Sequence, residues 1–526
     1  MPEAVLIAAL TVPPSADGRE IRALPPAVSC LEVRADRVGD LDPDWLRGHF
    51  SGDLLYTLRS AAEGGGEAGA AEQRRARLLA AAARYDLVDL EGARDLGLEV
   101  LARLPAARRL VSWHGGAAGA GELRQRFAQL AGTAARLYRL GVRAAGAAEA
   151  LAPLALLPEL GRSDVTAYAT GPAGSWSRLL APMLAAPVVF AGVADGIDGD
   201  GAFGAAQLVG DYGFPALPRA RRLFGIVGRS VGRSLSPRLH NDAYRRLDLR
   251  ALYLPFQVES FAAFLETAAA GLAALGMPLC GLTVAAPYKE SALGAAGSAT
   301  PLARRAGAAN TMLREGDSWR ADTADALGVV AALAAHRVAL AGRETAVVGC
   351  GGAGRAAAAG LQQAGARVTL VNRGRERGEL AARLLDLPFV PLAAFTPGRY
   401  SLVVNATPCT GAGEEWPFRP GELAAGTVVV DLPYAAAEPT PLAAATAAGG
   451  HTAIDGREVL LVEAQRQFQL MTGRRMPGAP ARALLERGSV SLHATLCERG
   501  ESASHGVPHG VPPGVPHDLR TEGAKR

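Results

Sequence analysis

The sequence predicts an α/β protein in which an N-terminal (β/α)8 barrel is followed by two further α/β units. A chain of 526 residues is too long for a single core, because domains hold roughly 150 residues each. Short apolar runs alternate with Ala- and Leu-rich helical patterns over residues 1–218. The alternation breaks at the Pro- and Gly-rich segment 210–222, and βα patterns start again at 223–228 and at 344–361.

Eight apolar runs in the first part have the length of buried strands, and a helical pattern follows most of them. This repeat is typical of a (β/α)8 barrel, which carries its functional groups at the carboxyl ends of its strands. Polar residues stand at or just after the ends of several runs. The runs are AVLIAAL (4–10), SCLEVRA (29–35), DLLYTLRS (53–60), YDLVDLE (85–91), RLVSWHG (109–115), TAARLYRL (133–140), DVTAYAT (164–170) and APVVFAG (186–192).

The overall charge, the short N-terminal apolar run and the cysteines argue against several classes of binding partner and site. A formal net charge of +4 is small for this length, and the sequence has no basic stripe with interleaved aromatic residues, so we expect no nucleic-acid partner. The apolar run near the N-terminus is too short to span a bilayer, and we expect no membrane partner. The five cysteines show no C-x-x-C spacing, which argues against a zinc site or a disulfide framework and favours a reducing cytoplasm.

Residues 486–526 have the composition of a disordered tail. The stretch SHGVPHGVPPGVPHD (504–518) repeats Pro, Gly and His and cannot build a core. We therefore expect its histidines to belong to a tail and not to a metal site.

A glycine-rich turn predicts a dinucleotide site. Gly349, Gly351 and Gly352 stand between an apolar strand and an Ala-rich helix. Glycines at such a turn let the backbone approach a pyrophosphate, which binds to the free N–H groups of the helix N-terminus.

The end of the next strand indicates which dinucleotide binds. Asn372, Arg373, Arg375 and Arg377 stand where an NAD-binding domain normally carries an acidic residue for the ribose hydroxyls. Guanidinium groups match a 2′-phosphate, so the sequence favours NADP over NAD.

Lys289, in GLTVAAPYKESAL (281–293), is a candidate catalytic residue. Of the 55 Lys and Arg residues only Lys289 and Lys525 are lysine. An ammonium group can stabilise negative charge on a substrate oxygen and also give up a proton, whereas a guanidinium stays charged. The retention of Lys289 in an arginine-dominated chain therefore indicates proton-transfer chemistry.

Together with Lys289 and the glycine turn, four segments resemble the shikimate dehydrogenase family in order and spacing, over residues 224 to about 480. The resemblance implies reduction of 3-dehydroshikimate to shikimate by NADPH, a step of chorismate and aromatic amino acid biosynthesis. The segments are VGRSLSPRLHN (231–241), AGAANTM (306–312), DTADALGV (322–329) and VVVDLPYAAAEPTPL (428–442).

The resemblance also assigns roles to single residues. Lys289 and Asp325 form the catalytic pair, and the hydroxyls of Ser234 and Ser236 hold the substrate carboxylate. The remaining assignments are Asn310 for a substrate hydroxyl, Tyr434 and Glu463 for the substrate, and Thr407 for the nicotinamide ribose. Simpler structural roles stay open: a helix N-cap for Asp325, a turn residue for Asn310, and strand-end residues for Thr407 and Tyr434.

Five positions in three segments depart from the family pattern and leave the substrate open. The family usually has Asn-Val-Thr where this chain has Thr283, Val284 and Ala285, and Asn-Thr-Asp where it has Thr323, Ala324 and Asp325. Glu463 stands where the family has Gln. Quinate is therefore an alternative substrate.

Five segments of the first part resemble type I 3-dehydroquinate dehydratase, the barrel enzyme one step earlier in the same pathway. The resemblance implies that Glu32, Arg34, Arg59, Arg178 and Gln207 bind the substrate and that His114 is the general acid/base. The segments are LEVRADRV (31–38), YTLRSAAEGG (56–65), YDLVDLEG (85–92), VSWHG (111–115) and TGPAGSWSRLL (170–180).

The barrel lacks the lysine with which that family forms a Schiff base. The lysine position falls at Arg139, and residues 1–288 contain no lysine. A guanidinium does not form the imine, so dehydratase activity is doubtful. Gly115 and Phe203 also replace the usual Asp and Ser.

The domain organisation and the alternatives follow from both resemblances. We expect a barrel over 1–218, a substrate-binding domain over 222–330 completed by about 455–485, a Rossmann NADP domain over 331–454, and the tail. The partners are then small molecules: 3-dehydroshikimate, shikimate, and 3-dehydroquinate or quinate. A non-catalytic protein that senses these metabolites is the alternative from another functional class.

Overall fold

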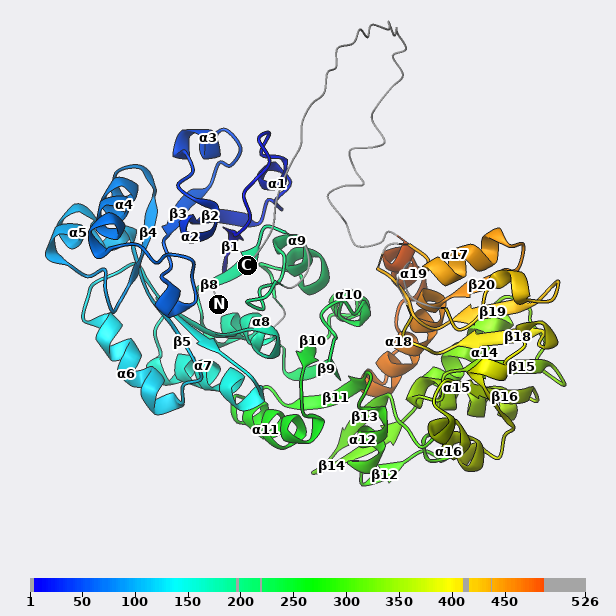
Figure 1. Ribbon diagram of the computed structural model, residues 1–526. Helices are drawn as coiled ribbons and strands as arrows, with labels where there is room; N and C mark the ends of the chain where they lie inside the picture. Colours follow the sequence, from blue (N-terminus) through cyan, green and yellow to red (C-terminus); the bar gives the residue numbers. More distant parts are fainter. Residues whose placement is uncertain (1–3, 195–197, 218–219, 410–415, 437, 487–526) are drawn as a thin grey trace, which may run out of the picture. The chain divides into compact units, whose positions relative to one another are not determined.

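The computed structural model describes residues 4–194, 198–217, 220–409, 416–436 and 438–486 (Figure 1). From residue 487 on, the expected tail lies outside the described residues. Within the described ranges, no helix has the length and hydropathy needed to cross a membrane.

The eight predicted runs all form strands of one parallel sheet, which confirms the expected barrel (Figure 1). Neighbours in the chain pair from β1 through β7, and β1 also pairs with β8. Among the described residues β7 and β8 share no ladder, so the barrel is nearly closed. The strands are β1 (Val5–Leu10), β2 (Val28–Arg34), β3 (Asp53–Thr57), β4 (Leu87–Glu91), β5 (Arg109–Gly115), β6 (Leu137–Arg143), β7 (Val165–Thr170) and β8 (Val188–Gly192).

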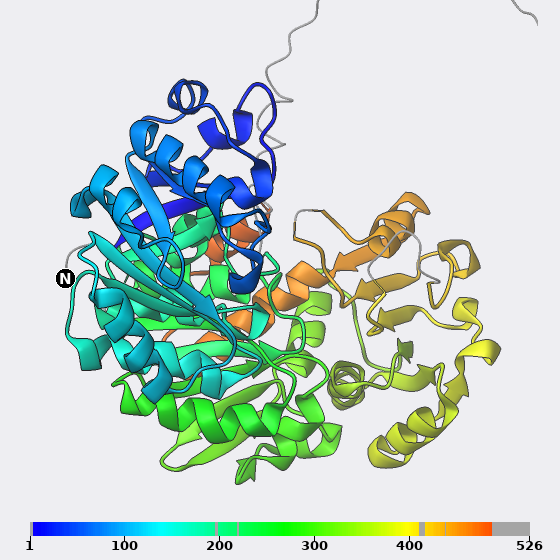
Figure 2. The ribbon, with the colours of Figure 1, turned by 60° about the vertical axis from the view of Figure 1, so that its left-hand side comes forward.

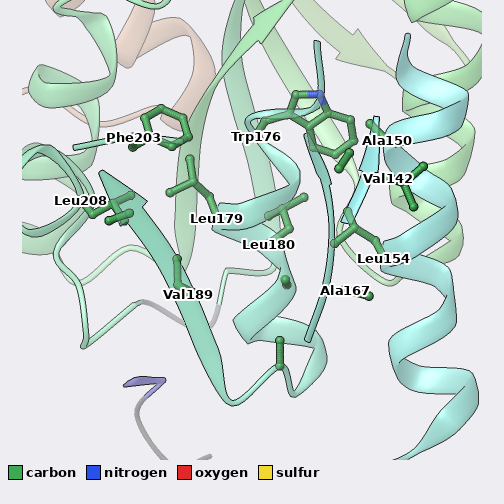
Figure 3. Close-up of a cluster of buried hydrophobic side chains, with 14 of the residues drawn as sticks. Val142, Ala150, Leu154, Ala167, Trp176, Leu179, Leu180, Val189, Phe203 and Leu208 are labelled. Atoms are coloured by element: carbon green, nitrogen blue, oxygen red, sulfur yellow. The ribbon is translucent and has the colours of Figure 1, made fainter. Parts of the chain in front are cut away.

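Alternating residues of these strands build an inner and an outer core. One buried cluster takes at least one side chain from every strand, among them Ile7, Leu55 and Phe190, and so fills the barrel interior. The outer faces pack against the surrounding helices, where Figure 3 shows Trp176 and Phe203 in a buried apolar cluster. The helices are α1 (Arg19–Arg22), α2 (Ala35–Val38), α3 (Pro43–Arg47), α4 (Ala71–Arg84), α5 (Leu98–Arg103), α6 (Ala120–Ala131), α7 (Ala147–Leu160), α8 (Ser177–Leu180) and α9 (Ala205–Gln207).

A second, mixed sheet follows, in the order β10-β9-β11-β13-β14-β12. Its first three strands are parallel, and β13 runs antiparallel to both β11 and β14. The strands are β9 (Arg222–Gly228), β10 (Ala251–Gln257), β11 (Leu279–Val284), β12 (Ser298–Ala299), β13 (Thr311–Glu315) and β14 (Ser318–Asp322); the helices are α10 (Ser236–Arg246), α11 (Phe261–Ala274), α12 (Lys289–Gly294) and α13 (Pro301–Ala306).

A third sheet is fully parallel, with the strand order β17-β16-β15-β18-β19-β20. This order is that of a dinucleotide-binding Rossmann sheet, in which the ligand binds where the strand order reverses, next to the first strand. The strands are β15 (Glu344–Val348), β16 (Arg367–Asn372), β17 (Phe389–Pro391), β18 (Leu402–Asn405), β19 (Val428–Asp431) and β20 (Thr452–Asp455); the helices are α14 (Asp325–Ala335), α15 (Gly352–Gln363), α16 (Arg375–Leu385), α17 (Pro441–Ala448), α18 (Gly456–Thr472) and α19 (Gly478–Glu486).

Helix α18, orange in Figure 2, contacts both of these sheets. Its N-terminal region lies against β20, and its apolar residues pack with side chains of β9 and β10 in one cluster. A buried polar chain adds to this contact. The Tyr253 hydroxyl donates to Thr283 Oγ1 at 2.6 Å, and Thr283 Oγ1 donates to Gln467 Oε1 of α18 at 3.0 Å. Helix α18 therefore completes the core of the second sheet.

Candidate active site

Lys289 and Asp325 form a close ion pair. Lys289 Nζ lies 2.8 Å from each carboxylate oxygen of Asp325, and the two side chains are only 16% and 6% exposed. Each residue is the first of its helix, α12 and α14. The N-cap position of α14 is Ala324, so Asp325 does not act as the cap. The pair holds an ammonium group in one orientation at the start of two helices.

Gly352 of the glycine-rich turn lies against the Lys289 side chain. A Cβ at position 352 would stand 2.8 Å from Lys289 Cβ and 3.2 Å from its Cδ, closer than side chains normally approach. Only a residue without a side chain allows the turn and the lysine stem to touch. The dinucleotide turn and the candidate proton donor are therefore neighbours.

Ser234, Ser236 and Tyr434 lie together at the start of α10. Ser234 Oγ accepts the backbone N–H of Ser236 at 3.2 Å, and Ser234 also hydrogen-bonds with Tyr434. Burial raises the pKa of Tyr434 above its ordinary value, so the phenol is a neutral donor. Two hydroxyls and a phenol at a helix N-terminus suit a carboxylate.

Asn310 is the last residue of the turn before β13, and hydrogen bonds to its side-chain carbonyl oxygen hold the side chain in place. Asn310 Oδ1 accepts from the backbone N–H of Ala324 at 2.8 Å and from the Thr311 hydroxyl at 2.9 Å. Its Nδ2 has no hydrogen-bond partner among the described residues. Asn310 is thus a structural turn residue whose amide is also an oriented N–H donor. This amide lies next to the start of α14.

The glycine turn has the backbone that close approach requires. Gly349 has φ of 106°, a region that favours glycine, and a Cβ there would lie 3.0 Å from the backbone of Ala406. The backbone N–H of Cys350 donates to Asn372 Oδ1 at 3.1 Å, which ties the turn to the end of β16. Gly351 caps α15, and a Cβ on it would meet open space. The first N–H groups of α15 thus remain available to a phosphate.

The arginines after β16 differ in their partners. Arg375 pairs with Glu379 at 2.8 Å, and Arg377 pairs with Glu290 at 3.0 Å. Arg373 is exposed and has no ion-pair partner in the part of the chain that the structure describes. It is the guanidinium best placed to receive a 2′-phosphate.

Thr407 follows β18 and is held by its neighbour. Its hydroxyl and its backbone N–H both bond to Asn405 Oδ1, at 2.7 and 3.1 Å, and Asn405 in turn donates to Asp431 at 2.7 Å. This places Thr407 beside the glycine turn, since Gly349 contacts the same backbone segment.

The barrel contains a cavity of about 210 Å³ lined by charged side chains at the carboxyl ends of its strands. Five of the residues expected there line it, together with Arg139 and Arg143, whereas Gln207 and Phe203 are not among the lining residues. The expected residues that line it are Glu32, Arg34, Arg59, His114 and Arg178. Gln207 lies at the end of α9 and hydrogen-bonds with Asp211.

Arg139 is fixed in the middle of this cavity. Its Nη1 donates to Glu32 Oε1 and its Nε to the Tyr168 hydroxyl, both at 2.7 Å, and its guanidinium carbon lies 3.6 Å from the Phe190 ring centroid. Burial opposes the charge, but Glu32 and Asp89 hold the pKa of Arg139 above its ordinary value. The residue at the lysine position is therefore a permanent cation.

The positive charge in the cavity is not fully compensated. Arg34 has a bidentate bond to Asp36 at 2.8 Å, but a buried guanidinium nitrogen of Arg59 has no partner among the described residues. Burial, with the charges of Arg139 and Arg34, lowers the pKa of Arg59 to about 10. Uncompensated buried cations favour an anionic ligand.

An acidic residue to which the sequence analysis gave no role lies next to His114. Glu63 accepts the backbone N–H of His114 at 2.8 Å and lies 3.5 Å from its Nδ1. Burial, then the charge of Glu91, raises the pKa of Glu63 to about 8, whereas burial and the surrounding arginines lower the pKa of His114 well below its ordinary value. At neutral pH the pair is a neutral imidazole beside a protonated carboxyl group.

Comparison with known proteins identifies both parts of the chain. The model of the shikimate dehydrogenase substrate-binding domain matches residues 226–312, and that of type I 3-dehydroquinase matches residues 15–214. A shikimate dehydrogenase (NADP(+)) from Syntrophobacter fumaroxidans is 34% identical over 282 residues, which are 51% of this chain and 94% of that protein. The chain belongs to the shikimate dehydrogenase family. The enzyme of that name from Halorubrum lacusprofundi is 38% identical over 289 residues, 50% of this chain and 99% of its own length.

Two solved structures match different shares of the chain. The shikimate 5-dehydrogenase from Thermus thermophilus, solved with NADP(H) and shikimate, is 29% identical, with a TM-score of 0.45, and covers 50% of this chain and 98% of its own. The dehydroquinate dehydratase and shikimate dehydrogenase of S. pombe AroM is 22% identical, with a TM-score of 0.40, and covers 92% of this chain and 98% of its own.

In this member of the shikimate dehydrogenase family, sequence reasoning misses contacts between segments far apart in the chain. Glu63 lies inside the segment 56–65 that resembles the dehydratase family, but the resemblance assigns no role to it, and Gln467 is an ordinary helix residue in the sequence. The contacts of both residues depend on how distant segments pack.

Proposed function

We propose that the chain from residue 222 on reduces 3-dehydroshikimate to shikimate with NADPH, a step of aromatic amino acid biosynthesis. The observation that carries this proposal is the Lys289–Asp325 ion pair in contact with Gly352 of the dinucleotide turn. The names of relatives at 34% and 38% identity support it.

The residues present fit NADP. Gly349, Gly351 and Gly352 leave the N-terminus of α15 accessible to the pyrophosphate, and Arg373 offers a free guanidinium for the 2′-phosphate. Asn372 holds the turn, and Thr407 lies next to it. When bound, NADPH supplies the hydride that reduces the ketone.

Lys289 handles the proton of the same reaction. Addition of hydride to a ketone leaves negative charge on its oxygen, which the Lys289 ammonium stabilises before it transfers a proton from Nζ to that oxygen. Asp325 keeps the ammonium oriented through both carboxylate oxygens. Burial of the pair strengthens this interaction because water does not screen it.

The substrate carboxylate would bind to Ser234 and Ser236, and a ring hydroxyl to the oriented amide of Asn310. Tyr434, bonded to Ser234, adds a neutral donor at the same place. The replacement of the family glutamine by Glu463 changes the polar groups around the ring, and for this reason quinate is the second candidate substrate.

Reduction of NADP⁺ should be measured with shikimate and with quinate side by side. A higher kcat/KM for shikimate supports the proposal, and a higher value for quinate supports the second substrate. Tight binding of shikimate and NADP⁺ without turnover would contradict the proposal and favour a metabolite-sensing protein.

For the barrel we propose binding of a polyhydroxy carboxylate, such as 3-dehydroquinate, without the imine. The supporting observation is the fixed guanidinium of Arg139 at the lysine position, next to the unpaired Arg59 nitrogen. Glu32 and Arg178 would contact the ligand, and His114 would lie beside it. Calorimetric titration with 3-dehydroquinate tests the binding, and absence of any heat or competition would contradict it.

We also propose a cytoplasmic location, which suits a biosynthetic enzyme that uses NADPH. Three cysteines in the described residues, Cys30, Cys280 and Cys350, are free thiols and support a reducing compartment. Fractionation of cells followed by an activity assay tests this location.

A further inference from the structure

Glu463 of helix α18 approaches the Lys289–Asp325 pair beside Gly328, which has no side chain to block it. Helices α14 and α18 pack against each other, and Gly328 lies three residues after Asp325, on the same face of α14. A Cβ at position 328 would stand 2.7 Å from Glu463 Cγ and 3.1 Å from its Oε1. Any larger residue would push the carboxyl group away, so the glycine admits Glu463 to the site.

The two carboxyl groups share one proton. Glu463 hydrogen-bonds with Asp325, and a hydrogen bond between two carboxyl groups requires that one of them carry the hydrogen. Asp325 binds the Lys289 ammonium through both of its oxygens, so Asp325 is the ionised partner. The proton therefore belongs to Glu463.

The surroundings favour the protonated form of Glu463 at neutral pH. Burial, then the negative charge of Asp325, raises the pKa of Glu463 to about 8, and the Lys289 ammonium opposes the shift only in part. An unshifted glutamate would be ionised at neutral pH. A glutamine, the residue usual in the family, would donate through its amide and could not ionise.

Other titratable groups near α18 do not replace Glu463 in this role. Tyr434, from the segment after β19, interacts with Glu463 and stays neutral because burial raises its pKa. On α10, His240 packs against Phe468 of α18, and burial lowers its pKa to about 3. His336, at the end of α14, pairs with Glu458 at 2.8 Å.

We propose that Glu463 is a positioning residue of the dehydrogenase site: its protonated carboxyl group donates to Asp325 and thereby holds the Lys289–Asp325 pair in its working geometry. The inference rests on the proposed function and adds a regulatory property to it. Loss of the Glu463 proton places a second negative charge beside Asp325, breaks the hydrogen bond and competes for the ammonium. Turnover therefore falls as the pH rises through the range in which Glu463 ionises.

The matched test is Glu463→Gln, which keeps the shape and a donor but cannot ionise. We expect kcat of the unmodified protein to fall about tenfold for each pH unit above about 8, and the fall at that position to be absent in Glu463→Gln. Glu458→Gln, the same change on the same helix, serves as control and should keep the alkaline fall. An unchanged alkaline fall in Glu463→Gln would overturn the proposal.

A second measurement does not depend on turnover. Because Glu63 contributes a second protonated carboxyl group with a similar pKa, infrared spectra are compared as differences: the unmodified full chain minus Glu463→Gln, both labelled with ¹³C at glutamate carboxyl groups, should show a protonated carboxyl band that titrates near pH 8. Gly328→Ala should shift or remove the same band, because the added Cβ displaces Glu463. If neither shikimate nor quinate is turned over but the band titrates, the proposed function fails and the Glu463–Asp325 contact stands. If the band attributed to Glu463 is missing at pH 7, the inference itself is wrong.

Discussion

Replacement of Lys289 by arginine separates charge from proton transfer in the dehydrogenase site. A guanidinium can still pair with Asp325, so we expect the fold and most of the NADP affinity to remain. It cannot release a proton near neutral pH, and it is bulkier than the ammonium that Asp325 now holds. Loss of a positioned proton donor typically costs about 100-fold or more in rate, or about 2.7 kcal/mol in the activation free energy.

The assay is shikimate-dependent NADP⁺ reduction at saturating concentrations of both substrates, together with a fluorescence titration of NADPH binding. The chain offers a matched control in Lys525→Arg, the same substitution at its other lysine, outside the segments that match the family. We expect kcat of Lys289→Arg to fall at least about 100-fold and that of Lys525→Arg to stay unchanged. Turnover by Lys289→Arg at the rate of the unmodified protein would refute the assignment of Lys289 as proton donor.

Three further changes test the other parts of the chain. Arg373→Asp should weaken NADP⁺ binding at least about tenfold more than NAD⁺ binding, because it removes a phosphate partner and adds a negative charge. Arg383→Asp, on the helix that follows, is the control and should not show this difference. Equal losses of affinity for both cofactors would contradict the assignment. Gly352→Ala should lower both kcat and NADP⁺ affinity, since the new Cβ meets the Lys289 side chain, and a variant with unchanged kinetics would show that this contact is unimportant. Treatment with 3-dehydroquinate and borohydride should leave no covalent adduct on the barrel by intact mass, because the barrel has no lysine. The variant Arg139→Lys restores the amine and should form the adduct if the pocket is still assembled. An adduct on the unmodified barrel would refute the reasoning.

The strands of the barrel could be predicted because their signal is local. Each run from AVLIAAL to APVVFAG contains the apolar side chains that its own strand buries, and all eight lie in one parallel sheet. The Rossmann sheet could be predicted for the same reason, since its glycine turn directly follows its apolar strand in the chain. The composition gave a further local signal, because a single internal lysine stands out among arginines.

Contacts across the fold could not be predicted in this way. The Glu63–His114 bond joins residues 51 positions apart. The segment that contains Glu63 resembles the dehydratase family, but the sequence does not show that its carboxyl group meets His114. The sequence comparison marked Glu463 as a departure from the family, but the effect of Gly328 on its position depends on how α14 and α18 pack. Gln207, which was expected to cap the barrel cavity, is not among the residues that line it and hydrogen-bonds with Asp211, so its role toward a ligand stays a prediction. In each case the deciding quantity is a distance between elements, which no single segment encodes.

The bond from Thr283 to Gln467 has a consequence for the order in which the chain can mature during synthesis. Thr283 and Tyr253 belong to strands made early, whereas Gln467 belongs to a helix that leaves the ribosome 184 residues after Thr283. Until then the Thr283 hydroxyl lacks its acceptor on α18, and the apolar side chains of β9 and β10 lack their cover. The second sheet must therefore wait for α18 before its core is complete. A ribosome that stops before residue 456 would release a chain whose second sheet still exposes apolar side chains, and such a product is a natural target for chaperones and proteases.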